Sequence, residues 1–539
     1  MRGLSIKTAV ALISCLSLAP AGMSVADSDF MKYMQQQQNE YQEYKDKRDK
    51  EFTSFLKSHW KEMKVFSGIK RDPAPKPVKM PVAKPMPKPS PVVVEKPDPR
   101  LEPKPVPRPA IKPKPQAKPE PVKPVPQTRP ELRPAPEQKP RPVVQAPVKP
   151  VVIIKPPVIK PKPVVKPVVS VPKGRSAKVN FFGRHLTFYY DPKMQTRLNG
   201  RINEKAIANF WSKLSKADYD GLLNQFNKQR GPLQLNDWSY ALLINDLAKE
   251  IYSGQKNEQS LFTWYMLIKS NYQARLAYSK YKVFLLLPTE QRLYSVAYFT
   301  FGGKRYYALG MDGNRAKPGK VFTYDGQYPG ATKAFNMALN QNLNTRPDKR
   351  TRRVSFVYSG KRYSVNVSHD TNTINYLRTY PQMDIGQYFM SRVNNEIGNP
   401  LLTQLREIIK GKSEEEAVNI LLLFVQNAFK YKTDQGQFGE ENYLFPEETM
   451  FYPYSDCEDR SVIFAWLVRS LTGLEVVGLD FPGHIAAAVK FSRRVNGDTV
   501  RHKGNVYVVT DPTYINARAG MTMPDFKKVR PKVISFKAF

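Results

Sequence analysis

The chain has 539 residues and a formal net charge of +38, with 85 Lys and Arg residues against 47 Asp and Glu residues. This length allows two or three domains, each with a hydrophobic core. A positive charge of this size can indicate nucleic-acid binding. Here, however, the charge is spread through a proline-rich tract and no recognition module accompanies it, which argues against a nucleic-acid partner and favours an anionic envelope surface.

The N-terminus predicts export. Basic residues precede an apolar run at residues 8–21, and small residues at 24–26 offer a cleavage site, so we expect a signal peptide over residues 1–26 and a location in the bacterial periplasm or cell envelope. Residues 12–15 also resemble a lipobox, which makes a lipoprotein anchored through Cys15 the alternative. No other apolar run reaches the ~18 residues of a membrane span.

Residues 27–70 predict an amphipathic helix that ends at Gly68. Its apolar residues follow i, i+3, i+4 spacing and are Phe52, Phe55, Leu56, Trp60 and Met63. An isolated helix with such a face requires a partner. The sequence leaves two alternatives open: contact with another protein or the membrane surface, or packing against the chain's own domain.

Residues 71–174 hold about two-thirds of the 48 prolines, in repeats with Lys, Val and Arg. Such a composition cannot form a core and favours extended polyproline II, with a reach on the order of 300 Å at ~3.1 Å per residue. We expect a disordered tether.

An internal duplication is predicted beyond this tether. Two alternating hairpins with Gly in the turn are each followed by apolar helices, and the paired segments are residues 179–189 with 354–365, 240–251 with 419–429, and 261–267 with 462–468. We therefore expect a degenerate domain at residues 175–345 and a complete one at 350–539. The first has residues 255–257 where the second has a cysteine, and it lacks a counterpart to residues 433–454.

That cysteine, Cys457, lies in the sequence YSDCEDRS, ahead of the apolar run at residues 462–468. Asp456 is a favourable N-cap residue, and we expect the helix to stop at residues 472–473. Unsatisfied N–H groups at a helix start favour a thiolate over a thiol. Besides Cys15 the chain has no other cysteine, so Cys457 lacks an internal disulfide partner after processing, as expected of a reactive thiol.

A base and an orienting carboxylate follow in the sequence. His484 begins an apolar strand after a Pro-Gly turn, and Asp511 follows the strand at residues 505–510, where a carboxylate can orient an imidazole. Each residue also has an ordinary structural interpretation: a packed cysteine, a turn histidine and an aspartate that ends a strand.

The motifs DCEDR, PGH and DPTY, in this order over residues 414–514, resemble those of the bacterial transglutaminase-like family, which has a papain-like cysteine fold. The resemblance implies an α+β catalytic domain in which Cys457 attacks an amide, His484 moves protons and Asp511 holds the imidazole. Members more often have Gly where Ser455 stands, a mild departure. Besides the Cys457 N–H, we consider Gln426 as the side chain that stabilises the oxyanion. Neither a metal nor an organic cofactor is implied.

We therefore expect an exported cysteine enzyme that transfers acyl groups from amides of a protein or peptide substrate, either to water or to an amine. The alternative is a non-catalytic envelope binding or scaffold protein. The degenerate domain is expected to be structural support or a recognition domain for an anionic cell-wall polymer. Its aromatic residues are expected to form exposed stacking surfaces as well as core, with core favoured for Trp264, and basic residues lie beside them: Trp264, Tyr265, Tyr272, Tyr278, Tyr281, Lys269, Arg275, Lys280 and Lys282.

Overall fold

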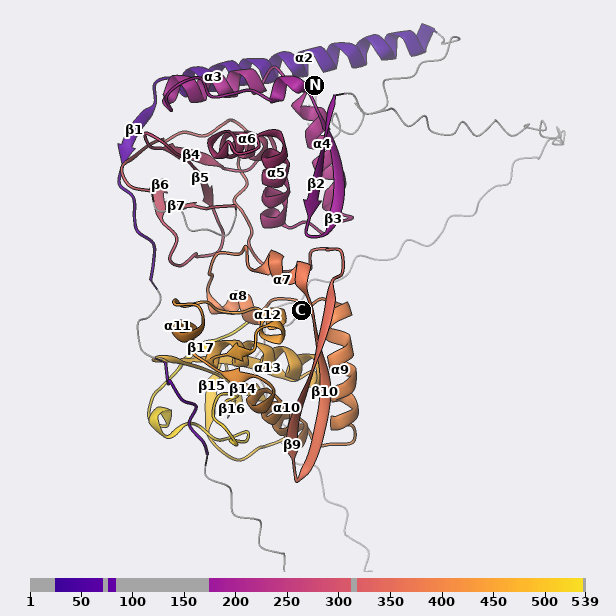
Figure 1. Ribbon diagram of the computed structural model, residues 1–539, viewed down its shortest axis with the longest axis vertical. Helices are drawn as coiled ribbons and strands as arrows, with labels where there is room; N and C mark the ends of the chain where they lie inside the picture. The colour runs from indigo at the N-terminus through magenta and orange to yellow at the C-terminus, as the bar shows by residue number, and fades with distance from the viewer. Residues whose placement is uncertain (1–24, 71–75, 84–173, 312–317, 537–539) are drawn as a thin grey trace, which may run out of the picture. The chain divides into compact units, whose positions relative to one another are not determined.

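The computed structural model describes residues 25–70, 76–83, 174–311 and 318–536 (Figure 1). The expected signal peptide, with Cys15, and most of the expected tether lie outside these residues, except that residues 25 and 26 already belong to α2 (Val25–Phe55). No helix in the described residues is long and apolar enough to span a bilayer.

The described chain is a mixed α/β protein with two consecutive sets of elements. The first set is β2 (Arg175–Phe181), β3 (Arg184–Tyr190), η2 (Pro192–Met194), α3 (Glu204–Leu214), α4 (Tyr219–Arg230), α5 (Asp237–Ile251), α6 (Lys256–Lys269), β4 (Arg275–Tyr278), β5 (Val283–Pro288), β6 (Tyr298–Phe301), β7 (Lys304–Ala308) and β8 (Val321–Tyr324). We call residues 174–345 the first half.

The second half, from residue 349 onward, repeats the scheme with additions. Its elements are β9 (Lys349–Tyr358), β10 (Lys361–Asp370), α7 (Thr371–Leu377), α8 (Ile385–Phe389), α9 (Asn395–Ile409), α10 (Glu414–Ala428), β11 (Lys430–Tyr431), α11 (Asp434–Gln437), α12 (Pro446–Phe451), β12 (Tyr454–Ser455), α13 (Cys457–Thr472), β13 (Glu475–Phe481), β14 (His484–Lys490), β15 (Thr499–His502), β16 (Asn505–Thr510), η3 (Pro524–Phe526) and β17 (Lys532–Ile534).

The two halves share one sheet topology. The first sheet has the order β8-β4-β5-β7-β6, with β1 (Trp60–Met63) added beside β8, and the second has the order β17-β13-β14-β16-β15. In both, the last strand along the chain lies beside the first and the fourth lies between the second and the third. All of these pairs are antiparallel. The common strand order is a property of the backbone pairing and does not depend on which residues lie at the candidate site.

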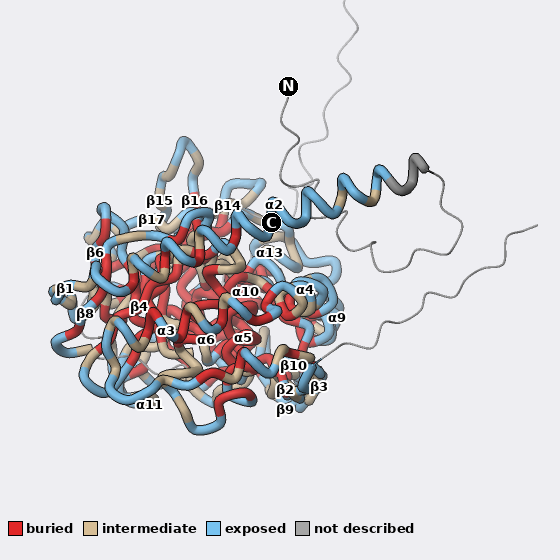
Figure 2. Tube along the Cα trace, turned by 90° about the horizontal axis from the view of Figure 1, so that it is seen from above, coloured by how far each residue is buried: buried red, intermediate tan, exposed pale blue. Residues whose placement is uncertain are grey.

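The hairpins that precede the sheets also correspond. Both turn through two residues with positive φ, Phe182-Gly183 in β2–β3 and Ser359-Gly360 in β9–β10, the conformation that suits the twist of a two-residue hairpin. Strand β2 packs on α5, as β9 packs on α10. The buried residues gather in the helices and strands inside the protein (Figure 2).

The expected helix over residues 27–70 is too long. Helix α2 ends at Phe55, and Trp60–Met63 forms strand β1, antiparallel to β8. The indole of Trp60 lies 4.9 Å from the ring of Tyr278 and 4.8 Å from that of Tyr324 (centroid distances). Pairing with the edge of an existing sheet therefore outweighs the helical spacing of the apolar residues.

The second part of α2 packs on its own protein. Phe52 is buried with its ring centroid 4.8 Å from that of Trp211, and Asp49 Oδ1 accepts a hydrogen bond from Lys269 Nζ at 2.5 Å. Towards the N-terminus of the helix, Phe30 remains 56 % exposed. Of the two alternatives for this helix, packing against the chain's own domain is therefore the one observed around Phe52.

Residues 76–83, which fall within the expected tether, are docked on the second half, and we call them the docked segment. Ile515 N donates to Pro81 O at 3.0 Å, and Ala83 N donates to Ile515 O at 2.8 Å. Ala83 is buried in a small apolar cluster with Tyr514 and Ala517. This part of the proline-rich tract is thus folded onto the protein.

Candidate active site

Helix α13 places Cys457 in its first turn. The helix spans Cys457–Thr472, Asp456 is the N-cap residue and Gly473 ends the helix with φ of 71°, which confirms the expected start and stop. The backbone N–H of Asp456 donates to Asp459 Oδ2 at 3.3 Å. The side chains of α13 are buried from Cys457 through Val468, so the helix runs through the core of the second half.

The thiol of Cys457 is buried beside carboxyl groups. Its Sγ donates to Glu458 Oε2 at 2.9 Å, and the residue is 0 % exposed. Burial, followed by the nearby carboxyl groups of Glu458 and Asp456, raises the pKa of the thiol well above its ordinary value. Burial therefore acts against the thiolate that the helix start was expected to favour. A helix start contributes up to ~2 kcal/mol, whereas full burial can shift a pKa by several units.

His484 and Asp511 form a buried pair. His484 is the first residue of β14, and Asp511 follows the last residue of β16. Because these neighbouring strands are antiparallel, the start of one and the end of the other lie at the same end of the strands in the sheet. His484 Nε2 lies 2.8 Å from Asp511 Oδ2. Asp511 Oδ1 accepts hydrogen bonds from the backbone N–H groups of Thr513 (2.9 Å) and Tyr514 (3.2 Å), which fix the carboxylate.

The imidazole has its second nitrogen available. His484 Nδ1 is buried without a hydrogen-bond partner among the described residues. Ser461, one turn after Cys457 on the same face of α13, donates from Oγ to Ile485 O at 3.0 Å. The face of the helix that carries the thiol is therefore turned towards the start of β14. The ring of Phe526 stacks on the imidazole with a centroid distance of 5.0 Å.

Gln426 has a structural role. Its Nε2 donates to the carbonyl oxygens of Tyr514 (2.9 Å), Ala517 (3.1 Å) and Asp511 (3.3 Å), and its Oε1 accepts from Asn516 N (3.0 Å). The amide is thus used entirely in holding the loop after Asp511. The expectation that Gln426 supplies an oxyanion donor is not met.

Arg460, the Arg of the DCEDR motif, links the same loop to α13, a role that sequence reasoning missed. Its guanidinium is buried and donates to Pro512 O at 3.4 Å, to Ser455 Oγ at 3.3 Å and to Phe429 O. Burial lowers the pKa of Arg460 to about 10. The signal in the sequence was an arginine at the start of an apolar helix. Such a side chain is expected to be at least partly buried and then requires hydrogen-bond acceptors.

A cluster of carboxyl groups surrounds the start of α13, and a lysine from the docked segment lies among them. Lys76 Nζ lies 2.8 Å from Asp456 Oδ2, 3.4 Å from Asp434 Oδ2 and 2.8 Å from Glu441 Oε1, and it also contacts Glu458 Oε1. Lys76 itself is 11 % exposed in its side chain. These five residues come from four parts of the sequence, which is why the sequence did not indicate the cluster.

The charges in this cluster are unequal. Burial and the neighbouring carboxyl groups raise the pKa of Asp434 to about 9 and raise that of Asp456 well above its ordinary value. For Glu458, burial raises the pKa, but the Lys76 ammonium and hydrogen bonds from Asp456 and Cys457 outweigh it, and the pKa is lowered. For Lys76, burial lowers the pKa but the carboxyl groups outweigh it, so the ammonium stays charged. The Lys76 ammonium is thus shared among several carboxyl groups, and among the three groups described here Glu458 is the one whose pKa is lowered.

The same oxygens could hold a cation. Two sets of three lie close enough together: Asp434, Glu441 and Glu458, and Asp434, Asp456 and Asp459. In this structure an ammonium group already contacts all three members of the first set.

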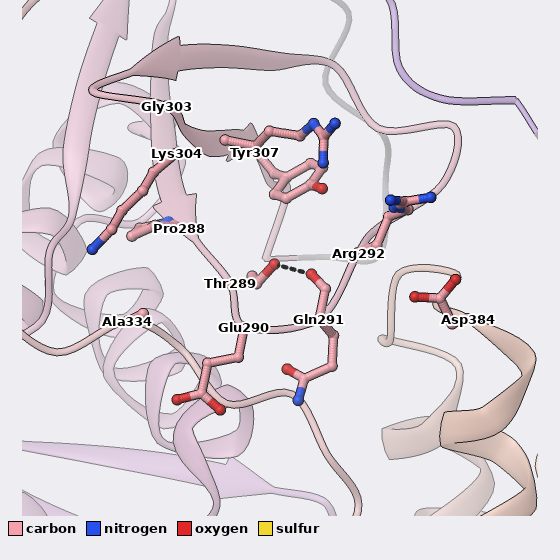
Figure 3. A pocket seen from close by; sticks show the side chains of 11 residues that line it. Pro288, Thr289, Glu290, Gln291, Arg292, Gly303, Lys304, Tyr307, Ala334 and Asp384 are labelled. Atoms are coloured by element: carbon pink, nitrogen blue, oxygen red, sulfur yellow. Dashed lines mark hydrogen bonds between the residues drawn. The ribbon is translucent and has the colours of Figure 1, made fainter. Parts of the chain in front are cut away.

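A cavity of about 680 Å³ in the protein lies away from these residues (Figure 3). It is lined by residues 288–292 and 303–305, with Tyr307, Ala334 and Asp384, and Thr289 Oγ1 donates to Gln291 O at 2.5 Å at its wall. Neither Cys457 nor His484 lines it. The cavity therefore adds nothing to the candidate active site.

The first half lacks the chemistry of the second at the equivalent positions. The first residue of α6 is Lys256, the first residue of β5 is Val283, and Leu309 follows β7. The link from α5 to α6 is short, whereas residues 429–456 join α10 to α13 and carry Asp434 and Glu441. The first half therefore has neither a triad nor an acidic cluster in this place.

Most of the aromatic residues considered for a stacking surface of the first half form its core, as expected for Trp264. Four of the five are buried: Trp264, Tyr265, Tyr272 and Tyr278. Tyr281 is exposed. Lys269 and Arg275 are buried in ion pairs with Asp49 and Asp325. Of these five aromatic residues, only Tyr281 is therefore available for stacking at the surface.

We compared the chain with models of protein families, with curated proteins and with solved structures, and none of the three comparisons finds a match.

Proposed function

We propose that this protein is a cysteine-dependent acyl-transfer enzyme that acts on amide bonds of a protein or peptide, with a papain-like, transglutaminase-like catalytic domain in the second half. The observation that carries the proposal is the buried pair of His484 and Asp511, held at the end of a sheet in which the Ile485 carbonyl accepts a hydrogen bond from Ser461 of α13. Cys457 lies one turn before Ser461 in the same helix. A buried histidine that is hydrogen-bonded to a carboxylate and has one free nitrogen is poised to exchange protons.

The proposed reaction has two steps. In the first, Cys457 Sγ attacks the amide carbon, its proton passes through His484 Nδ1 to the leaving amine, and the C–N bond breaks as the S–C bond forms. In the second, water or an amine attacks the thioester, the S–C bond breaks and His484 returns the proton to sulfur. Asp511 holds the imidazole through Nε2. The Cys457 N–H, which has no intrahelical partner at a helix start, faces the oxyanion.

The first half is proposed to be a copy of the same fold without catalytic residues, because its sheet has the same strand order. The expected signal peptide makes the envelope the proposed location, and a cell-wall-associated protein or peptide the proposed substrate. With the second part of α2 packed on the first half, contact with a membrane surface is proposed only for the exposed N-terminal part of that helix.

One observation favours a second function. The thiol hydrogen-bonds Glu458 and is fully buried, as expected for a non-catalytic envelope binding or scaffold protein that keeps the fold without turnover. The two candidates differ in whether Cys457 ever becomes acylated.

The test uses two assays on the purified chain. Transfer is measured as incorporation of monodansylcadaverine into dimethylcasein, and hydrolysis as release of ammonia or of new amino termini from the same protein. Cys457→Ala and His484→Ala are the matched negative controls. Activity that requires both residues supports the enzyme. No activity in either assay, both in wild type and in Lys76→Met, which removes the ammonium group beside Cys457, supports the scaffold function, as does activity that survives both substitutions.

A further inference from the structure

The docked segment contacts the protein on both sides of the candidate active site. At its first residue, Lys76 contacts the carboxyl groups of Asp456 and Glu458, which flank Cys457 in the chain. At its last residue, Ala83 pairs with Ile515 in the loop that follows Asp511. The segment therefore reaches from the nucleophile's helix to the loop of the third triad residue.

Its backbone is held as an extended peptide would be. Tyr431 Oη donates to Pro77 O at 2.6 Å, and Pro81 and Ala83 bond the two sides of Ile515. Strand β11, which carries Tyr431, pairs with β12 immediately before the DCEDR motif. Backbone pairing with pockets for selected side chains is a general way to bind an extended chain.

The side chains of the segment are unequally buried. Lys76 and Ala83 point into the protein, whereas Val78 is 82 % exposed and Lys79 is exposed. Met80 Sδ lies 2.9 Å from Arg460 Nη1. The protein thus contacts the ammonium group of Lys76, whereas Lys79, the second lysine of the segment, is left in solvent.

We propose that the carboxyl cluster of Asp434, Asp456 and Glu458 is a subsite for the ammonium group of a lysine that precedes proline, and that Lys76 is its resident occupant, so that the docked segment shields Cys457 until a Lys-Pro peptide displaces it. This inference rests on the proposed function, because it names the substrate side chain next to the nucleophile.

Charge makes the subsite selective. If the segment left and nothing replaced Lys76, Asp434, Asp456 and Glu458 would lose the ammonium group that all three contact, and these buried carboxyl groups would lie together without a cationic donor. A neutral side chain cannot relieve this, whereas another ammonium can. A peptide with lysine at this position therefore exchanges with the segment, and one with an uncharged residue of the same length does not.

The chain itself contains further copies of the seated tripeptide. Lys-Pro-Val occurs at residues 76–78 and recurs in the proline-rich tract at residues 104–106, 123–125, 149–151, 162–164 and 166–168. Peptides that contain Lys-Pro-Val thus carry the side chain that the carboxyl cluster holds. A peptide with the sequence of the docked segment is therefore the appropriate probe.

The test measures the accessibility of Cys457 in the full chain, as the rate of alkylation by iodoacetamide followed by intact mass. Lys76→Met removes the ammonium and keeps the length of the side chain, and Lys79→Met is the matched control on the same segment. We expect alkylation at least tenfold faster in Lys76→Met, because release of the segment lets the reagent reach the thiol, and an unchanged rate in Lys79→Met. Equal rates in wild type and folded Lys76→Met would overturn the proposal.

A second variant guards against misfolding of the first. Tyr431→Phe removes only the hydrogen bond to Pro77 O, so we expect alkylation roughly fivefold faster. If Lys76→Met does not fold, an unchanged rate in Tyr431→Phe overturns the proposal.

The third measurement uses a peptide with the sequence of residues 76–83, added to Lys76→Met. It should slow alkylation towards the wild-type rate, and the same peptide with norleucine at its first position should not. Equal protection by both peptides would contradict a lysine subsite. If these results hold while the casein assays show no turnover in wild type or in Lys76→Met, the subsite stands and the enzyme does not. If turnover holds without them, only the subsite fails.

Discussion

Lys76 Nζ lies 2.8 Å from Asp456 Oδ2, although 380 positions of sequence separate the two residues. Asp456 is the N-cap of the helix that carries Cys457. The edge of the proline-rich tract therefore belongs to the candidate active site, and the electrostatics of the thiol depend on it. The predictions below test the parts of this arrangement one at a time.

Removing the thiol should separate catalysis from folding. We expect Cys457→Ala to abolish transfer and hydrolysis while lowering the free energy of unfolding by about 1–2 kcal/mol, because a small side chain and one hydrogen bond to Glu458 are lost. Urea unfolding and the casein assays measure the two effects. A folded variant that retains turnover would end the proposal of an enzyme.

The carboxylate of Asp511 should matter for orientation. Asp511→Asn is expected to lower kcat by roughly 10³-fold or more with little change in KM, since the imidazole loses the acceptor at Nε2. Asp525→Asn, at an exposed carboxylate near the site, is the control and should leave kcat unchanged. Near-normal kcat in Asp511→Asn would assign the third role to another residue.

Gln426 should behave as a structural residue. Gln426→Leu leaves three carbonyl oxygens without their donor, and we expect a loss of about 3 kcal/mol in the free energy of unfolding. Gln404→Leu, which removes exposed hydrogen bonds to Asn366 and Pro400, should cost less than about 1 kcal/mol. If Gln426→Leu keeps its stability and loses only kcat, the amide acts on the oxyanion after all.

Stability should fall as the pH rises through neutrality. Burial raises the pKa of Glu448 to about 8 and that of Glu447 to about 7. Between the ordinary carboxyl pKa and these values the folded state holds protons that the unfolded state has lost. The free energy of unfolding therefore decreases with rising pH, by up to about 1.4 kcal/mol per pH unit for each group.

Glu448→Gln removes one of these groups and keeps an acceptor for the Phe445 N–H. Urea unfolding at several pH values between about 5 and 8 should show a shallower decline in this variant than in wild type. Glu415→Gln, at an exposed position, should follow the wild-type slope. Parallel slopes in wild type and Glu448→Gln would show that this carboxyl group does not take up a proton on folding.

Local patterns in the sequence predicted much of the second half. The strand over residues 505–510, the strand that begins at His484 and the helix that stops before Gly473 are all found, because each has its own periodicity and its own turn or cap. The matched hairpins followed from alternation around a glycine turn. The common strand order of the two sheets could not be predicted from these local patterns, because it depends on which strands pair with each other.

Contacts between distant segments explain what the sequence missed. Trp60 follows the helical spacing of α2, but an available sheet edge changes its structure. Proline content predicts an extended chain at Lys76, yet it says nothing of the carboxyl groups that the lysine meets. The thiol pKa is set by burial, which a helix-start pattern does not report.

The central claim is that Cys457 and His484 act as a pair. The most direct measurement is the rate at which p-nitrophenyl acetate acylates Cys457, followed by intact mass in wild type and in His484→Ala. The comparison is made once in the protein with Lys76 and once in the Lys76→Met variant, so that shielding of Cys457 by the docked segment does not decide the outcome. We predict acylation at least about 100-fold faster with His484 present, followed by loss of the acyl group to water or an added amine. Equal rates with and without His484, in folded protein of both backgrounds, would contradict the account.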